Sequence, residues 1–151
     1  MKIKNGDMWD SYSTSDLFLI TTNSYVRKDG ALVMGRGIAQ QAKTRYPSVP
    51  YQAGKWLRDN NLVNGTYGIL TEPFDTHLGL FQVKVHYADA ARLDLIEFSA
   101  KMLAEYLGVC DLKNVNLNFP GIGYGHLSEA DVLPILEKYF ENLPITVWKY
   151  A

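Results

Sequence analysis

Short apolar runs alternate with helix-patterned segments along most of the chain. Residues 17–22 (LFLITT) are apolar and β-branched, which predicts a buried strand, and the turn-forming pair Asn23 and Ser24 ends it. Similar patterns predict further strands over residues 67–70, 78–85, 115–119 and 145–150. Apolar residues at helical spacing predict helices over residues 38–46, 50–60, 90–107 and 134–142. Strands alternating with helices favour an α/β sandwich in which helices cover a sheet.

Capping residues and prolines predict where the helices begin and end. Asp89 is expected to cap the helix over residues 90–107, and Gly108 is expected to close it. Pro134 has no N–H to donate to the preceding turn and disfavours a continuous helix. Ser128 is therefore expected to open one helical turn, with the main helix beginning at Pro134.

Two glycine-rich segments each follow a predicted strand. Residues 34–39 (MGRGIA) precede a helix, and residues 121–125 (GIGYG) follow the strand over residues 115–119. Such loops let backbone N–H groups approach a phosphate, and a helix N-terminus favours its negative charge. Neither segment has the lysine of a P-loop or the spacing of the dinucleotide fingerprint. The segments therefore predict a diphosphate site at the carboxyl edge of the sheet, with plain tight turns as the alternative.

Composition limits the remaining possibilities. The 151 residues are 47% hydrophobic and 21% charged, so we expect one folded domain over residues 1–151. The net charge is −1 and the longest basic run is Arg27–Lys28, which disfavours non-specific nucleic-acid binding. Cys110 is the single cysteine, and no apolar run approaches the ~20 residues of a membrane span. We expect a cytoplasmic monomer that needs no cofactor. We also expect no metal, because no His, Cys and Asp cluster has ligand spacing.

The motifs, taken in order, resemble those of a macro domain, the ADP-ribose-binding fold. The resemblance covers nearly the whole chain: it begins with GDMW at residues 6–9, includes both glycine segments and QVK at residues 82–84, and extends through FPGIGYGHL at residues 119–127. It is nearest to the branch of the terminal ADP-ribose glycohydrolase, the antitoxin against a DNA-ADP-ribosylating toxin, and stand-alone phage and bacterial macro domains. It implies a three-layer α/β/α sandwich with a mixed, mostly parallel sheet.

The resemblance also implies an orientation for ADP-ribose. Asp7 would accept a hydrogen bond from the adenine amino group, Trp148 would pack on adenine, and Asn23 would approach the distal ribose. Their alternatives are a helix cap for Asp7, core packing for Trp148 and an ordinary turn for Asn23. Tyr124 would lie over phosphate and ribose. The full set of expected ligand-binding residues is Asp7, Met8, Asn23, Met34, Gly35, Arg36, Gly37, Ile38, Ala39, Gly121, Ile122, Gly123, Tyr124, Gly125 and Trp148.

Lys84 distinguishes an enzyme from a binding module. In the similar glycohydrolases, a lysine at this position attacks the anomeric carbon of the distal ribose, which requires a partly deprotonated amine. The alternative is a solvated lysine at the end of a strand. The terminal glycohydrolase also has an acid in its second loop, where this chain has Gly125, so His86 or His126 would have to replace it, or substrate and water suffice, or turnover is lost.

Two functions follow from these observations. The first is a hydrolase that releases ADP-ribose from a modified carboxylate or base, or acts on ADP-ribose 1''-phosphate or O-acetyl-ADP-ribose. The second is a non-catalytic reader or sequestering module. In either case the expected partner is ADP-ribose or an ADP-ribosylated protein or nucleic acid, and no membrane is involved.

Overall fold

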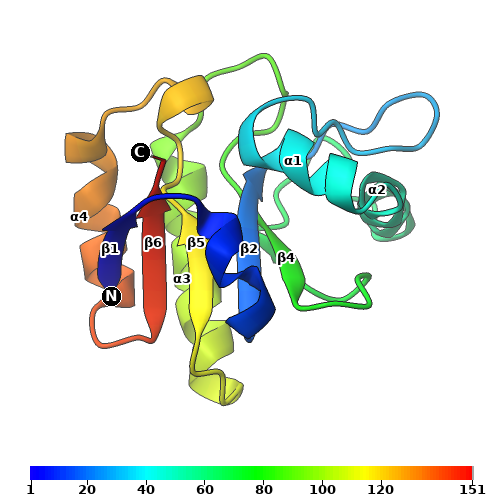
Figure 1. The fold of residues 1–151 in the computed structure, drawn as a ribbon. Helices are drawn as coiled ribbons and strands as arrows, with labels where there is room; N and C mark the ends of the chain where they lie inside the picture. The colour runs from blue at the N-terminus through cyan, green and yellow to red at the C-terminus, as the bar shows by residue number, and fades with distance from the viewer. Residues whose placement is uncertain (151) are drawn as a thin grey trace.

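Parallel pairing organises the sheet of the computed structural model, which describes residues 1–150 (Figure 1). The strand order is β1-β6-β5-β2-β4-β3, and among these strands only the edge strand β3 runs antiparallel to its neighbour. The elements are β1 (Lys2–Asn5), η1 (Met8–Thr14), β2 (Leu17–Thr22), α1 (Gly37–Arg45), α2 (Val49–Asp59), β3 (Ile69–Leu70), β4 (Leu78–Gln82), α3 (Leu93–Val109), β5 (Val115–Asn118), η2 (Gly123–Gly125), α4 (Glu129–Phe140) and β6 (Ile145–Lys149).

Helices cover both faces of the sheet, which confirms the three-layer sandwich. Strand β2 shows the arrangement, because its residues alternate between two separate clusters of buried side chains. Phe18 and Ile20 pack with α1, α2 and η1, whereas Leu17 and Leu19 pack with α3 and α4. Figure 1 shows α3 behind the sheet and α1 with α2 beside β2. The central strand is therefore buried on both faces, as its continuous apolar run predicted.

Helix α3 begins later than its capping pattern predicted. Arg92, not Asp89, occupies the position before its first turn, and Cys110 follows its last residue in place of Gly108. Tertiary hydrogen bonds explain the later start: Ala91 N–H donates to Gly125 at 2.9 Å and Arg92 N–H to Val83 at 2.9 Å. These bonds hold the chain before α3 in an extended path toward the edge of the sheet.

Helix α4 runs through Pro134, so the predicted break is wrong. Ser128 does cap the helix, accepting a hydrogen bond from the Asp131 N–H, as expected. Pro134 removes one helical hydrogen bond, a cost of about 3 kcal/mol in a helix interior. Val132 and Leu136 are fully buried on either side of the proline, and this packing against the sheet keeps the helix continuous.

The strands differ from the sequence pattern mainly at their ends. β4 stops at Gln82, three residues earlier than predicted, and β3 contains only Ile69 and Leu70. The sequence pattern did not reveal β1 (Lys2–Asn5), because all four of its residues are exposed at the edge of the sheet and carry no apolar alternation. No helix within residues 1–150 has both the length and the apolar character needed to cross a bilayer.

Gly54 provides a direct test of the packing between α2 and the loop before α1. A Cβ at this position would stand 1.9 Å from the carbonyl oxygen of Gly30. We expect Gly54→Ala to lower the free energy of unfolding by about 1–3 kcal/mol, the usual cost of overpacking. The matched control is Gly108→Ala in α3, where no other atom lies within 4 Å of the added Cβ. This change should be neutral or stabilise by up to about 1 kcal/mol. Urea denaturation measures both, and equal effects would contradict the packing argument.

Candidate functional site

A cavity of about 980 Å³ lies where the parallel strands end. Residues that follow β2, β4 and β5 line it, together with both glycine segments and the end of β6. Every residue predicted for the site is in this lining: Lys84, Asp7, Met8, Asn23, Met34, Gly35, Arg36, Gly37, Ile38, Ala39, Gly121, Ile122, Gly123, Tyr124, Gly125 and Trp148. The structure thus brings the predicted residues together, while the role of each one stays a prediction.

The first glycine segment leads into the N-terminus of α1 at the cavity wall. Gly37 is the first residue of the helix and has a φ of 57°, which favours glycine. Arg36 precedes it in an extended conformation, and no side chain of the described residues caps the helix. Gly35 is exposed, and a Cβ there would meet no protein atom within 4 Å. An uncapped helix N-terminus beside open space is suited to an anionic ligand.

The second glycine segment is packed more tightly against its surroundings. Gly121 has a φ of 79°, and a Cβ there would lie 2.8 Å from the side chain of Ile96. At Gly125 a Cβ would lie 3.0 Å from the Cβ of Ala91, and the Ala91 N–H donates to the Gly125 carbonyl at 2.9 Å. A side chain at position 125 would therefore press on Ala91, which would have to shift by a few tenths of an ångström. The position where the sequence lacks an acid is thus one that packs closely against Ala91.

Tyr124 connects the two segments across the cavity. The residue is 59% exposed, and the Arg36 guanidinium lies 5.4 Å from the ring centroid. A Cβ at Gly37 would be 3.6 Å from the same ring. The Lys84 ammonium also reaches the Tyr124 carbonyl oxygen, at 3.5 Å. Both cations therefore lie close to the second glycine segment.

Lys84 lies two residues beyond the end of β4, not within a strand as predicted. Buried Gln82 fixes this exit, because its Nε2 donates to the carbonyls of Gly65 at 2.8 Å and Lys84 at 3.2 Å. Its Oε1 accepts from the backbone N–H groups of Tyr67 at 2.7 Å and Gly68 at 3.2 Å. The side-chain amide is thus fully bonded, and the backbone at Lys84 is held in place from a buried position.

The pKa of Lys84 is lowered from its ordinary value. Partial burial is the main cause, since it disfavours the charged amine; Asp89 acts in the opposite direction, and Arg36 adds a further lowering. Lys84 forms no ion pair within the part of the chain that the structure describes. A half-buried amine with a neighbouring cation has the environment of a nucleophilic lysine.

Asp7 and Asn23 have structural bonds as well as places in the cavity wall. Asp7 Oδ1 accepts from the Trp9 N–H at 3.0 Å and so caps η1. Asn23 Oδ1 accepts from the Tyr25 N–H at 2.9 Å, and its Nδ2 donates to the Val33 carbonyl at 3.0 Å. These are the cap and turn that the sequence offered as alternatives. Each carboxylate or amide oxygen can accept more than one hydrogen bond, so these structural bonds leave both residues able to contact a ligand.

Trp148 lies at the other side of the cavity, on β6. Its Nε1 donates to Asn116 Oδ1 at 2.8 Å, and the ring is half-buried against the core on the α1 side of the sheet. A Cβ at Gly6 would lie 3.6 Å from the ring. Trp148 is therefore fixed by a hydrogen bond and by packing, and part of its surface faces the cavity.

Several lining residues had no signal in the sequence. The polar residues among them are Asn5, Thr21, Thr22, Gln41, Tyr87, Asn118, Glu129, Lys149 and Tyr150. Asn118 ends β5 and bonds to Thr21 through both its Nδ2 and Oδ1, so its place at a strand end was the available clue. Of the two histidines considered, His126 lines the cavity, whereas His86 does not. Within residues 1–150, no three His, Cys, Asp or Glu side chains form a metal-binding group.

Comparisons with known proteins bear on the fold. The macrodomain of Mycobacterium tuberculosis DarG superposes with a TM-score of 0.78 and 22% identity, covering 99% of this chain and 98% of that one. Thermosipho africanus DarTG in complex with ADP-ribose superposes with a TM-score of 0.76 and 20% identity, covering 100% of this chain and 42% of that one. The chain has the macro domain fold. The resemblance found in the sequence is therefore confirmed at the level of the fold.

Sequence comparison gives related proteins for this macro domain fold. The DNA ADP-ribosyl glycohydrolases of Mycobacterium bovis and Mycobacterium tuberculosis are each 28% identical to the chain over 138 residues. The match covers 89% of this chain but 39% of those proteins, so the chain corresponds to well under half of each relative. No protein-family model matches the sequence.

The electrostatic environment of Lys84 in this macro domain can be tested by substitution. Asp89→Asn should lower the pKa of Lys84, because Asp89 stabilises the charged amine, and Arg36→Gln should raise it by removing a nearby cation. The pKa is measured by NMR titration of ¹³C-methylated lysines, with the Lys84 signal assigned by its loss in Lys84→Arg. Shifts in the same direction for both variants, or no shift in either, would contradict the assignment of these neighbours.

Proposed function

We propose that the cleft binds ADP-ribose, with adenine near Asp7 and Trp148 and the distal ribose near Asn23 and Lys84. The diphosphate would lie between them, over the N-terminus of α1 and the second glycine segment. Support comes from the meeting of two glycine segments and the cation Arg36 at one place in the cavity. Further support comes from the related structure of Thermosipho africanus DarTG, which is described as a complex with ADP-ribose.

We also propose that the protein hydrolyses ADP-ribosyl linkages, with Lys84 as the nucleophile. The lone pair of the neutral Nζ attacks the anomeric carbon as the bond to the leaving group breaks, and the leaving group takes the bonding electrons together with the proton that Nζ loses on forming the C–N bond. Water then displaces Nζ from the anomeric carbon: its oxygen becomes the hydroxyl of the released ADP-ribose, and its other proton goes to Nζ, which leaves with the electrons of the C–N bond as the neutral amine. The observation that carries this function is Lys84 itself, half-buried, with a lowered pKa, between the two glycine segments. The related DNA ADP-ribosyl glycohydrolases support hydrolysis as the reaction class.

A non-catalytic ADP-ribose reader is the second candidate. Position 125 favours it, because Gly125 stands where the similar terminal glycohydrolase has its acid, and a Cβ there would lie only 3.0 Å from the Cβ of Ala91. The carboxylates in the cavity wall are Asp7 and Glu129, and each already has a partner, the Trp9 N–H and Lys149 respectively. A reader would bind ADP-ribose through the same glycine segments and would carry out neither chemical step.

Gly35→Val tests the binding site without straining the fold. Gly35 does not have a positive φ and is surrounded by open space, so valine would fit the protein and project into the phosphate position. We expect ADP-ribose affinity to fall by at least about tenfold, since a backbone donor is obstructed. Isothermal titration calorimetry measures it, with Gly108→Val as the same substitution away from the cleft. Unchanged affinity in folded Gly35→Val would remove this segment from the ligand site.

Lys84→Ala separates the hydrolase from the reader. Wild type should release free ADP-ribose from at least one of four substrates: ADP-ribosylated glutamate, ADP-ribosylated DNA, ADP-ribose 1''-phosphate and O-acetyl-ADP-ribose. In Lys84→Ala the rate should fall by more than about 10²-fold, while Lys113→Ala, an exposed lysine elsewhere, should retain it. Because the neutral amine is the reactive form, wild-type kcat/KM should rise with pH through the pKa of Lys84. Mass spectrometry detects the product; binding without turnover in wild type would establish a reader.

A further inference from the structure

A cluster of three aromatic rings lies beside the loop that carries Lys84. We call Tyr25, His86 and Tyr87 the aromatic stack. His86 stacks on Tyr87 with ring centroids 4.4 Å apart and planes at 25°. Tyr25 meets both rings edge-on, at 4.8 Å from His86 and 5.2 Å from Tyr87. These are favourable aromatic geometries, so the three rings support one another in a defined arrangement.

Hydrogen bonds fix the backbone that carries the stack. The Ala88 N–H donates to His86 Nδ1 at 3.1 Å, which orients the imidazole ring. The Asp89 N–H donates to the His86 carbonyl at 3.2 Å, and the Ser24 N–H to the Val85 carbonyl at 3.1 Å. The aromatic stack is therefore held at both of its segments, and little side-chain freedom remains to be lost when a ligand binds.

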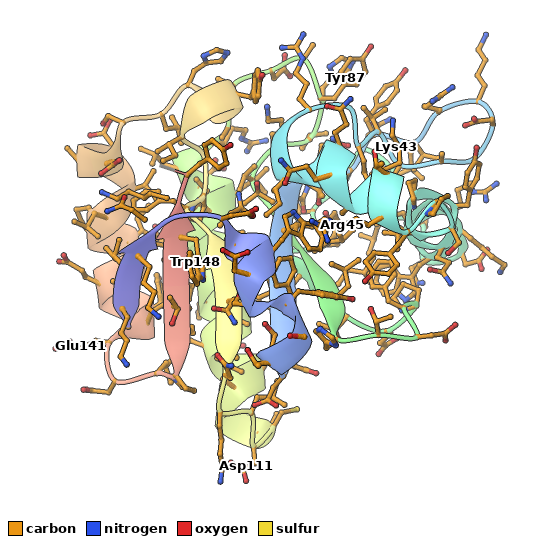
Figure 2. All side chains as sticks on the ribbon, viewed as in Figure 1. Lys43, Arg45, Tyr87, Asp111, Glu141 and Trp148 are labelled. Atoms are coloured by element: carbon orange, nitrogen blue, oxygen red, sulfur yellow. The ribbon has the colours of Figure 1, made fainter. Side chains whose placement is uncertain are left out.

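The stack presents one ring to the cleft. Tyr87 lines the cavity together with Lys84 and is 49% exposed, while His86 and Tyr25 are half-buried beside it. Figure 2 shows Tyr87 at the top of the molecule and Trp148 far from it, on β6. The cavity wall thus has an aromatic residue on the same loop as Lys84, and this residue is separate from Trp148 on β6.

Tyr87 is also more available to a ligand than Tyr124. The Tyr124 ring already has the Arg36 guanidinium over it. Among residues 1–150, the rings that contact Tyr87 are His86 and Tyr25 alone, and no cation lies over it. An exposed, rigid ring with free surface in a cavity wall is the kind of group on which a planar ligand stacks.

We propose that Tyr87, supported by His86 and Tyr25, is a stacking subsite for a planar heteroaromatic group attached to the anomeric carbon of ADP-ribose. This inference rests on the proposed function, which leaves the linkage open, and it selects a base-linked substrate over a carboxylate-linked one. A nucleobase presents a flat π-surface at the point of attachment. An uncharged aromatic ring can stack on this surface whichever base it is. A side-chain carboxylate ester presents no such surface and gains little from Tyr87.

The test measures binding in a background that cannot turn over, Lys84→Ala. The ligands are free ADP-ribose, the isolated thymidine nucleoside carrying ADP-ribose on its base, and a glutamate peptide carrying an ADP-ribosyl ester. A nucleoside is used because it has no backbone phosphate for cations near the first glycine segment, such as Arg27 and Lys43, to contact. We expect the nucleoside conjugate to bind more tightly than free ADP-ribose by about fivefold to one hundredfold, the range of one base–aromatic stack.

Substitutions at position 87 then assign that gain. Tyr87→Ala should abolish the advantage of the nucleoside conjugate and leave the affinity for free ADP-ribose unchanged, whereas Tyr87→Phe, which keeps the ring, should retain the advantage. Tyr51→Ala is the matched control, because Tyr51 has a similar exposure of 51% and lies on α2 outside the cleft. Equal binding of the nucleoside and peptide conjugates would overturn the inference, as would an equal loss for all three ligands in Tyr87→Ala.

The outcomes also distinguish this inference from the proposed function. If free ADP-ribose binds but the nucleoside gives no gain, the stacking subsite fails and the ADP-ribose site stands. If free ADP-ribose does not bind to the folded protein, the proposed function fails and the subsite with it. A gain that depends on Tyr87, with no turnover by wild type, would identify a reader of ADP-ribosylated bases.

Discussion

The parallel pairing of β2 with both β4 and β5 is the constraint on which the cleft depends. Parallel strands end at one edge of a sheet, so Asn23, Lys84 and the second glycine segment all leave the sheet there. The register pairs Thr22 with Gln82, the last residue of each strand. A slip of one residue would turn the apolar side chains of β2 to the wrong face, so burial in both clusters holds this register. The core that stabilises the sheet therefore also determines where the cleft forms.

At this edge the fold stabilises an arrangement that is unfavourable for Lys84 itself. Its folded pKa is below its ordinary value, so the unfolded chain holds the proton more firmly. Between these two pKa values, stability rises with pH, because the unfolded state binds more protons there. Gln82 opposes this local cost. Any movement that broke the four hydrogen bonds of its buried side-chain amide to the backbone would leave polar atoms unsatisfied and would destabilise the folded state. Lys84 thus stays near Arg36 because Gln82 holds its backbone in place, and no ion pair within the described residues holds its ammonium group.

The sequence predicted many of the residues that line the cleft, but it did not predict the tertiary contacts that hold them in place. The glycine segments were recognisable because their backbone requirements leave glycine in the sequence, as the positive φ of Gly37 and Gly121 illustrates. The start of α3 was missed because tertiary bonds from Ala91 and Arg92 overrode the capping signal of Asp89. The aromatic stack was invisible for a similar reason: its rings come from two loops that only the β2–β4 pairing brings together. Local backbone chemistry was therefore readable, and contacts between distant segments were not.

The segment between β4 and α3 carries the residues on which the proposed function depends most. Over residues 83–92 it carries Lys84, presents Tyr87 and places Ala91 against Gly125. A side chain at position 125 would press on Ala91, whose N–H donates to the Gly125 carbonyl and whose neighbour Arg92 donates to the Val83 carbonyl. Moving Ala91 would disturb the same short segment that carries Lys84 and Tyr87. Glycine at position 125 is therefore linked to the close packing of the two loops.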